Sequence, residues 1–175
     1  ALKGMVNAFN EYSRNPDRKS ELVDVNELVL DVIELYRATS VAIETKLDNK
    51  NIFLWGDTGK LRQVLHNLIQ NSEQALMGHT NPEILIETVA TPDVTQIRIQ
   101  DNGPGLSDEV MSRAFDPYYT TKAKGTGLGL AIVRKIVEEH DGAVSIRNGE
   151  VGAVIEITLP LSHTTDNAKI LNETV

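Results

Sequence analysis

Apolar side chains recur every three or four residues in four stretches of the chain, and this spacing predicts four amphipathic helices. The first helix ends before Pro16, because the residue preceding a proline disfavours helical angles. Asp24 or Asn26 caps the second helix, and Asp57 or Thr58 caps the third. The apolar stripes are Leu2, Met5, Val6, Phe9 and Tyr12; Val25, Leu28, Val29, Val32, Ile33 and Tyr36; Leu61, Val64, Leu65, Leu68, Ile69 and Leu76; and Ile132, Val133, Ile136 and Val137.

Runs that alternate apolar and polar residues predict the β-strands. Two such runs flank the Pro92-Asp93 turn, and this arrangement predicts an antiparallel hairpin. Because helices and strands do not alternate one for one, we expect a mixed or antiparallel sheet with helices on one face. The predicted strands are residues 41–47 and 51–55, joined by the turn 48–50; residues 84–88 and 94–99; and residues 143–147 and 153–159, joined by the turn 148–150.

The composition is that of a soluble, acidic, globular domain. Lys and Arg number 17 against 25 Asp and Glu, a formal net charge of −8, which repels a phosphate backbone and disfavours nucleic acid as a partner. The absence of cysteine excludes a disulfide scaffold and a thiolate metal site. No stretch approaches the roughly 20 apolar residues that span a bilayer. We therefore expect a cytoplasmic piece of a longer protein, whose own membrane topology stays open.

The third predicted helix carries Asn67 and Asn71 on one face, because residues four apart lie above one another on a helix. Leu65, Leu68 and Ile69 take the buried side, so the two amides point outward. Amide oxygens are neutral, hard ligands that suit a Mg²⁺ ion already bound to phosphates. Two ordinary surface asparagines would give the same pattern, so this helix alone does not establish a site.

Asp101 ends an apolar strand and is followed by a glycine turn that contains Gly103 and Gly105. A carboxylate at a strand end can accept a hydrogen bond from an exocyclic amine, and glycine lets the backbone approach a flat ring closely. Asp-Asn-Gly is also an ordinary turn signal. The motif is consistent with a base-binding site and does not prove one.

The sequence Gly125-Thr126-Gly127-Leu128-Gly129 leads directly into the last long helix. Backbone N–H groups at the positive end of a helix form an anion site. The spacing fits neither the dinucleotide fingerprint nor the P-loop. Lys122 and Lys124 place positive charge beside these glycines in an otherwise acidic chain, which favours an anionic ligand over a merely flexible loop.

None of the four histidines lies in a pattern typical of a metal ligand or a phosphoacceptor. His66 lies on the core-facing run of the asparagine helix, His79 follows that helix, and His163 lies in the tail. His140 ends a helix, where a positive charge would meet the helix dipole. None of them pairs with a cysteine or with another histidine at metal-binding spacing.

The asparagine helix, the Asp-x-Gly-x-Gly turn, the Phe-x-Pro-Tyr loop and the Gly-x-Gly-x-Gly helix resemble, in order and spacing, the N, G1, F and G2 boxes of histidine kinase catalytic domains. The resemblance covers about residues 22–161. It implies an α+β fold, a two-layer α/β sandwich in which three helices cover a mixed sheet of about five strands, with a flexible ATP lid near residues 107–124. Residues 1–13 and the phrase from Phe115 to Val133 resemble the NtrY-like nitrogen-regulation sensor kinases.

This resemblance implies a role for each site residue. Asn71 would be the Mg²⁺ ligand, with Asn67 beside it near the phosphates, and Lys122 the phosphate-facing lysine of the lid; these three are the expected catalytic residues. Asp101 would bind the adenine amine, and Phe115 would anchor the lid. The implied cofactors are ATP and Mg²⁺, and the expected nucleotide contacts are Asn67, Asn71, Asp101, Gly103, Gly105, Lys122, Gly125, Thr126, Gly127, Leu128 and Gly129.

The chain departs from the family pattern after Asn71. Many members carry a lysine and an aromatic residue three and four positions later, where this chain has Gln74 and Ala75. A phosphate contact and ring stacking from this helix therefore remain open. Tyr118 or Tyr119 is the candidate replacement for the missing ring.

We predict that residues 1–16 are the end of a dimerisation helix, residues 20–161 the catalytic ATP-binding domain and residues 162–175 a polar tail. A helix folded onto its own domain is the alternative for the first segment. The domain would transfer the γ-phosphoryl of ATP to a histidine on the dimerisation domain of a homodimeric parent kinase, and onward to a response-regulator receiver domain. The phosphoacceptor motif itself is absent from the chain.

Two other functions stay open from the sequence. One is a pseudo-kinase module that binds nucleotide and signals by shape. The other is an ATP hydrolase of the gyrase or mismatch-repair type, a class that resembles this chain and places a water-activating glutamate where Asn67 stands. Because an asparagine cannot accept a proton, rapid hydrolysis is disfavoured.

Overall fold

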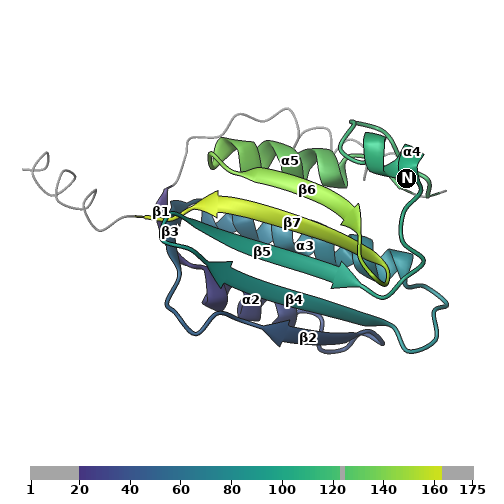
Figure 1. The fold of residues 1–175 in the computed structure, drawn as a ribbon, viewed down its shortest axis with the longest axis horizontal. Helices are drawn as coiled ribbons and strands as arrows, with labels where there is room; N and C mark the ends of the chain where they lie inside the picture. Colours follow the sequence, from purple (N-terminus) through teal and green to yellow (C-terminus); the bar gives the residue numbers. More distant parts are fainter. Residues whose placement is uncertain (1–19, 123–124, 163–175) are drawn as a thin grey trace, which may run out of the picture.

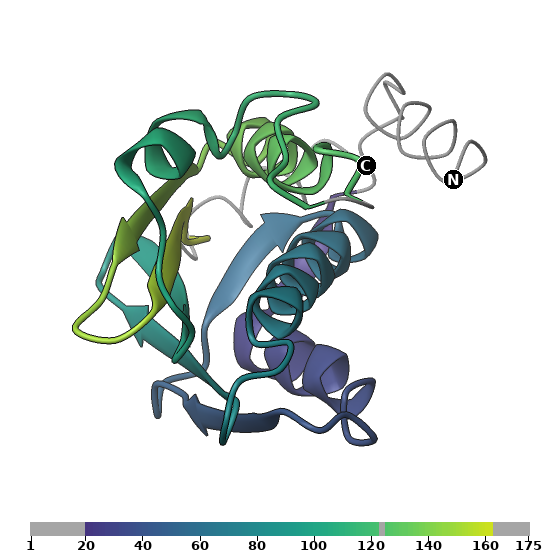
Figure 2. The same ribbon diagram turned by 90° about the vertical axis from the view of Figure 1, so that its right-hand side faces the viewer.

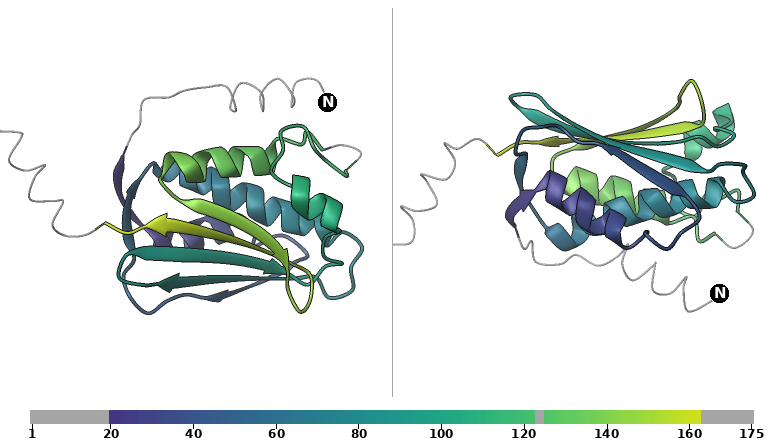
Figure 3. Two further views of the ribbon diagram at one scale, coloured as in Figure 1. Left: turned by 45° about the horizontal axis from the view of Figure 1, so that its top comes forward. Right: turned by 90° about the horizontal axis from the view of Figure 1, so that it is seen from below.

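The computed structural model describes residues 20–122 and 125–162, which form a sheet covered on one face by helices (Figure 1). Figure 3 shows the two layers, with the sheet along one side and the three long helices against it. The sheet order is β2 (Ala42–Lys46), β4 (Glu83–Ala90), β5 (Val94–Asp101), β7 (Ala153–Pro160) and β6 (Ala143–Asn148). The helices are α2 (Val25–Glu34), α3 (Thr58–Ala75) and α5 (Gly129–Glu139), with a short α4 (Asp108–Arg113).

The predicted fold class is confirmed. The sheet is mixed, because β2 runs parallel to β4 while the other neighbours are antiparallel. The hairpins β4–β5 and β6–β7 form where the alternating runs predicted strands. The first predicted helix and the residues after 162 lie outside the described residues. Within the described ranges, no helix is both long and apolar enough to cross a bilayer.

Strands form in both stretches where residues 41–47 and 51–55 predicted them, but these two strands do not pair with each other. β2 pairs with β4 in the main sheet, whereas β3 (Phe53–Gly56) pairs with β1 (Glu21–Asp24) in a separate two-stranded ribbon. The intervening residues carry the chain from one sheet to the other. Asp48 fastens this connection, since its carboxylate accepts hydrogen bonds from the backbone N–H groups of Ala90 and Lys50. These bonds lower the pKa of Asp48 below its ordinary value.

The core lies between the sheet and the helices, and the helical stripes and strand alternation both point into it. Asp24 and Asp57, rather than their neighbours, cap α2 and α3 by accepting from backbone N–H groups in the first turn. Burial of the apolar side chains is the main stabilising term of the domain. The most deeply buried residues include Val32, Leu68, Ile84, Ile86, Val133, Val137 and Ile157.

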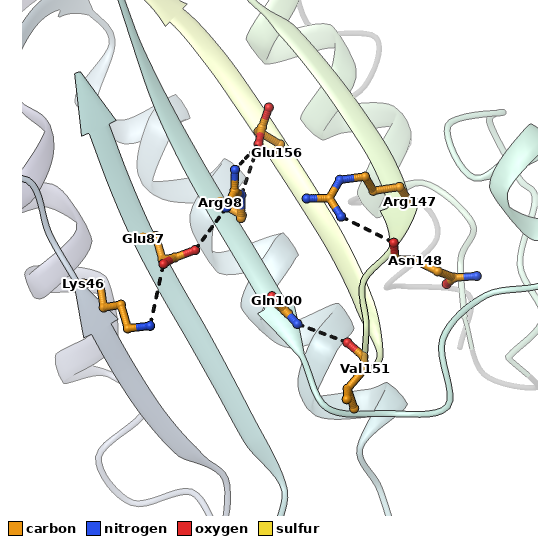
Figure 4. Close-up of polar contacts among 8 residues, drawn as sticks. All are labelled: Lys46, Glu87, Arg98, Gln100, Arg147, Asn148, Val151 and Glu156. Carbon is orange, nitrogen blue, oxygen red and sulfur yellow. Dashed lines mark hydrogen bonds and ion pairs between the residues drawn. The ribbon is translucent and has the colours of Figure 1, made fainter. Parts of the chain in front are cut away.

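The opposite face of the sheet carries a row of alternating charges across four strands (Figure 4). Lys46, Glu87, Arg98 and Glu156 stand directly opposite one another in register. The Glu87 carboxylate lies 3.9 Å from Lys46 and 3.4 Å from Arg98, and Arg98 lies 3.1 Å from Glu156. Opposite charges in cross-strand pairs support the register, although each exposed pair contributes only about 0–1 kcal/mol.

Two contacts fasten α3 to α5 at the end of the domain where α3 begins. The Lys60 ammonium lies 2.7 Å from the Glu139 carboxylate, and both side chains are largely buried. His140 Nε2 accepts a hydrogen bond from the backbone N–H of Asp57 at 3.0 Å. A ring nitrogen that accepts is unprotonated, so His140 acts as a neutral acceptor here and not as a helix-terminal charge. His66 is exposed and bonds the Tyr36 hydroxyl, so its expected place on the core-facing side was also wrong.

Candidate functional site

A cavity of about 610 Å³ opens beside α3. The end of β5 and the start of β7 line it on the sheet side, and α4, the loop after α4 and the start of α5 line the rest. Figure 2 looks at this end of the molecule and shows α4 and the following loop beside α5. A volume of this size suits a nucleotide. The cavity brings together the predicted site residues other than Gly103 and Phe115: Asn67, Asn71, Asp101, Gly105, Lys122, Gly125, Thr126, Gly127, Leu128 and Gly129.

One end of the cavity is built around Asp101, the last residue of β5. Its side chain is 5% exposed, and Oδ1 accepts hydrogen bonds from the backbone N–H groups of Gly103 at 3.0 Å and Ala153 at 3.2 Å. Its second oxygen, Oδ2, makes no hydrogen bond to any residue that the structure describes. Gly103 therefore orients Asp101 and does not itself line the cavity. The carboxylate is held with one oxygen occupied and the other available to a donor.

The walls around Asp101 are mostly apolar and suit a flat ring. Val110 and Ala114 come from the α4 region, and Ile146, Ala153 and Ile155 come from the sheet. A flat heterocycle placed there would bury its faces against methyl groups and direct its polar edge to Asp101. Asp101 and these walls together form one end of the cavity, which offers an acceptor beside an apolar surface.

Two residues that the sequence analysis missed hold this end in shape. The Asn148 side chain clamps the turn after Asp101: it accepts from the Leu106 N–H at 2.8 Å and donates to the Leu106 carbonyl at 2.9 Å. Gly152 has φ +66°, and a Cβ there would lie 1.9 Å from the Asp101 carbonyl oxygen. Both residues lie in the β6–β7 hairpin, where asparagine and glycine read as ordinary turn residues. No local signal separates their role from that of a turn.

The opposite end of the cavity is built from amides and a helix start. Asn67 and Asn71 both face the cavity from α3, and Asn67 Nδ2 donates to the Gly129 carbonyl at 3.4 Å. Gly129 begins α5, whose preceding residue Leu128 provides no side-chain cap. The first N–H groups of a helix have no intrahelical partners, so this edge attracts an anion such as phosphate.

Lys122 lies across this end and is half-buried. Its ammonium donates to Asn71 Oδ1 at 3.2 Å and to Gln74 Oε1 at 2.6 Å. Burial lowers the pKa of Lys122 below its ordinary value. In this contact the chain's own cation lies on Asn71 Oδ1, the oxygen to which Mg²⁺ is expected to bind. Asn71 Oδ1 is thus accessible from the cavity and attracts a positive charge.

The Tyr118 backbone ties the segment that follows α4 to the glycine box. The Tyr118 N–H donates to the Gly127 carbonyl at 2.8 Å, and a Cβ at Gly127, whose φ is +68°, would lie 2.4 Å from the Tyr118 carbonyl carbon. Only glycine fits this close approach. Tyr119 lines the cavity with the Arg113 guanidinium 4.2 Å from its ring centroid, whereas Tyr118 is 56% exposed and does not. Phe115 is half-buried and lies outside the cavity lining.

The fold and the two-ended cavity define a nucleotide-binding domain of the two-layer α/β type. Residues 56–163 match the family described as histidine kinase-, DNA gyrase B- and HSP90-like ATPase, and the chain belongs to this family. The NtrY-like sensor histidine kinase of Rickettsia bellii is 33% identical over 165 residues, which cover 91% of this chain and 27% of that protein. The chain thus spans about a quarter of the length of this relative.

Solved structures agree with this assignment. The catalytic domain of histidine kinase ThkA is 31% identical, with a TM-score of 0.74 over 81% of this chain and 95% of that one. ThkA in complex with the response regulator protein TrrA matches 92% of this chain and 47% of that one, with 28% identity and a TM-score of 0.79. Within its family, the chain is the ATP-binding catalytic domain of a sensor histidine kinase.

Proposed function

We propose that this domain binds ATP with its adenine against Asp101 and its phosphates against the start of α5, and transfers the γ-phosphoryl to a histidine of a separate dimerisation domain. The observation that carries the proposal is the chemistry of the cavity lining. Among the described lining residues, Asp101 is the one acid, and it lies at the adenine end. No lining carboxylate is therefore placed to activate water at the phosphate end, where Asn67 stands instead.

This lining favours a kinase over a hydrolase. An imidazole is already a nucleophile and needs little help from a general base, whereas water needs one. In the transfer, the bond between the γ-phosphorus and the bridging oxygen breaks, a bond from phosphorus to an imidazole nitrogen forms, and ADP leaves. The domain contributes position and charge neutralisation, as in phosphoryl transfer generally.

Asn71, with Asn67 beside it, would hold Mg²⁺ through amide oxygens. This ion would neutralise the charge on the phosphates and keep part of its water shell. Lys122 adds a cation from the lid side, and the N–H groups of Gly127 and Gly129 would face the phosphates. Thr126 supports this turn, because its hydroxyl accepts from the Leu128 N–H at 3.3 Å.

The partners that we propose follow from the same reaction. The acceptor histidine would lie on a dimerisation domain, to which residues 1–16 would belong. The parent kinase would be a homodimer whose catalytic part lies in the cytoplasm. A response-regulator receiver domain would take the phosphoryl group next; the ThkA complex with TrrA supports this choice of partner.

The test mixes the chain with Mg-ATP and a purified dimerisation domain that contains the acceptor histidine, and measures acid-labile phosphate on that domain. We expect labelling that Asn71→Ala abolishes and that Asn49→Ala, at an exposed turn outside the cavity, leaves unchanged. ATP binding without labelling would point to the pseudo-kinase. Steady phosphate release by the chain alone would point to the hydrolase.

A further inference from the structure

Gln74 lies one helical turn after Asn71 on α3, and the two side chains share one hydrogen-bond donor. Both side chains accept from the Lys122 ammonium, Gln74 Oε1 at 2.6 Å and Asn71 Oδ1 at 3.2 Å. Gln74 itself is exposed, and its side chain lines the cavity. The lid lysine is therefore bridged between two amide oxygens of one helix.

The shorter of the two contacts is the one to Gln74. A hydrogen bond from an ammonium is roughly twice as strong as one between neutral groups. Gln70 shows that an amide on this helix does not bond Lys122 by default: it also lines the cavity from α3, yet makes no hydrogen bond to any described residue. The contact thus depends on the placement of Gln74, next to the end of the lid.

Asn71 cannot keep Lys122 when the proposed site is filled. Its Oδ1 is the expected Mg²⁺ ligand, and an ammonium and a divalent cation repel one another at a shared oxygen. Binding of Mg-ATP therefore requires Lys122 to leave Asn71. Gln74 is not a proposed metal ligand and can retain the ammonium during this exchange.

We propose that Gln74 is a positioning residue for Lys122, which holds the ammonium at the phosphate end of the cavity while Mg²⁺ takes its place on Asn71. This inference rests on the proposed function. Lys122 then supplies the positive charge that many relatives provide from the helix itself, at the position Gln74 occupies. The same contact joins the lid to α3, in addition to the Tyr118–Gly127 bond, which joins it to the glycine box before α5.

The first test is a double-mutant cycle with Gln74→Met and Lys122→Met, in which the dissociation constant of a fluorescent ATP analogue is measured with Mg²⁺ and with EDTA. Methionine keeps the length of glutamine and removes its acceptor. We expect Gln74→Met to weaken Mg-nucleotide binding about 3- to 10-fold, less than the loss of a buried charge-assisted hydrogen bond, because Gln74 is exposed. In the Lys122→Met background it should change nothing further. Gln96→Met, on the open face of the sheet, is the matched control.

The second test needs no nucleotide. Hydrogen exchange of the backbone N–H groups in residues 118–122 should speed up in Gln74→Met and return to the wild-type rate in Gln74→Glu, which restores an acceptor for the ammonium. Equal effects of Gln74→Met with and without Lys122 would overturn the proposal, as would unchanged affinity and exchange. A wild-type chain that fails to bind Mg-ATP would instead refute the proposed function.

Discussion

Replacing Asp101 by asparagine changes the adenine end of the cavity by one atom. Oδ1 of Asp101 is committed to the backbone N–H groups of Gly103 and Ala153. An asparagine at this position would keep its carbonyl oxygen on these two donors, because the alternative orientation would turn an NH₂ group toward two N–H groups. The NH₂ would then face the cavity, where Asp101 offers Oδ2. A donor would thus replace the acceptor for the adenine amine.

Asp101→Asn should reduce the affinity for ATP more than it reduces the free energy of unfolding. A hydrogen bond to a charged group contributes about 1.5–3 kcal/mol, so its loss weakens ATP binding about 10- to 150-fold. The two backbone bonds persist with a neutral acceptor, which costs about 1 kcal/mol of unfolding free energy. Asp101→Ala is a harsher change, because it leaves two buried N–H groups unpaired at about 1–3 kcal/mol each.

The assay compares the dissociation constants of ATP and inosine triphosphate, in which a carbonyl replaces the adenine amine, alongside denaturant unfolding of each variant. We expect Asp101→Asn to weaken the binding of ATP strongly. The binding of inosine triphosphate should weaken little or become stronger, since the new NH₂ can donate to the carbonyl. A folded Asp101→Asn variant with the wild-type ratio of the two affinities would refute the proposed contact with the amine.

Three further predictions concern the frame around the site. Gly152→Ala should lower the unfolding free energy by more than 2 kcal/mol, because a left-handed φ costs about 1–2 kcal/mol and its Cβ would also strike Asp101; Gly78→Ala, with φ +78° but open space, should cost only the backbone term. Burial, then the charge of Glu73, raises the pKa of Tyr36 to about 12. The folded state therefore keeps a proton that the unfolded chain releases near pH 10, and stability should fall by about 1–2 kcal/mol between pH 10 and 12, since solvent screens part of the full effect, a loss absent from Tyr36→Phe. Arg98→Met should cost about 1 kcal/mol in denaturant unfolding, and less at high salt.

The fold was predictable where structure is local. The two hairpins follow from alternation on either side of a short turn, and α3 follows from a long apolar stripe after a capping residue. The strand at residues 42–46 was predicted, but its partner was not, because the parallel pairing with β4 joins segments about forty residues apart. The ribbon of β1 and β3 was missed for the same reason. Four residues of β1 carry too little pattern to reveal a strand.

The sequence predicted the residues that line the site better than it predicted the residues that hold them in place. The motifs name residues that contact a ligand, and the structure gathers nearly all of them around one cavity. Asn148 and Gly152 act only through residues far away in sequence, so their role appears when β6–β7 is folded against the turn after Asp101. From the sequence, Tyr118 and Tyr119 were equal candidates to replace the aromatic residue that is missing at position 75. Only Tyr119 lines the cavity, so it is the one that can meet the base.

The two ends of the cavity are held by different parts of the chain. Binding measurements with and without Mg²⁺ can therefore separate base binding from metal binding, which an activity assay cannot do. Asp101 is fixed by Gly103 in the turn after β5 and by Ala153 in β7, whereas Lys122 is held by side chains of α3. Substitutions at Asp101 should therefore weaken nucleotide binding by the same factor with Mg²⁺ and with EDTA. Changes at Asn71 should matter mainly when Mg²⁺ is present. If both variants lost affinity in the same proportion under the two conditions, adenine and metal would not be bound at separate ends, and the orientation of ATP proposed here would be wrong.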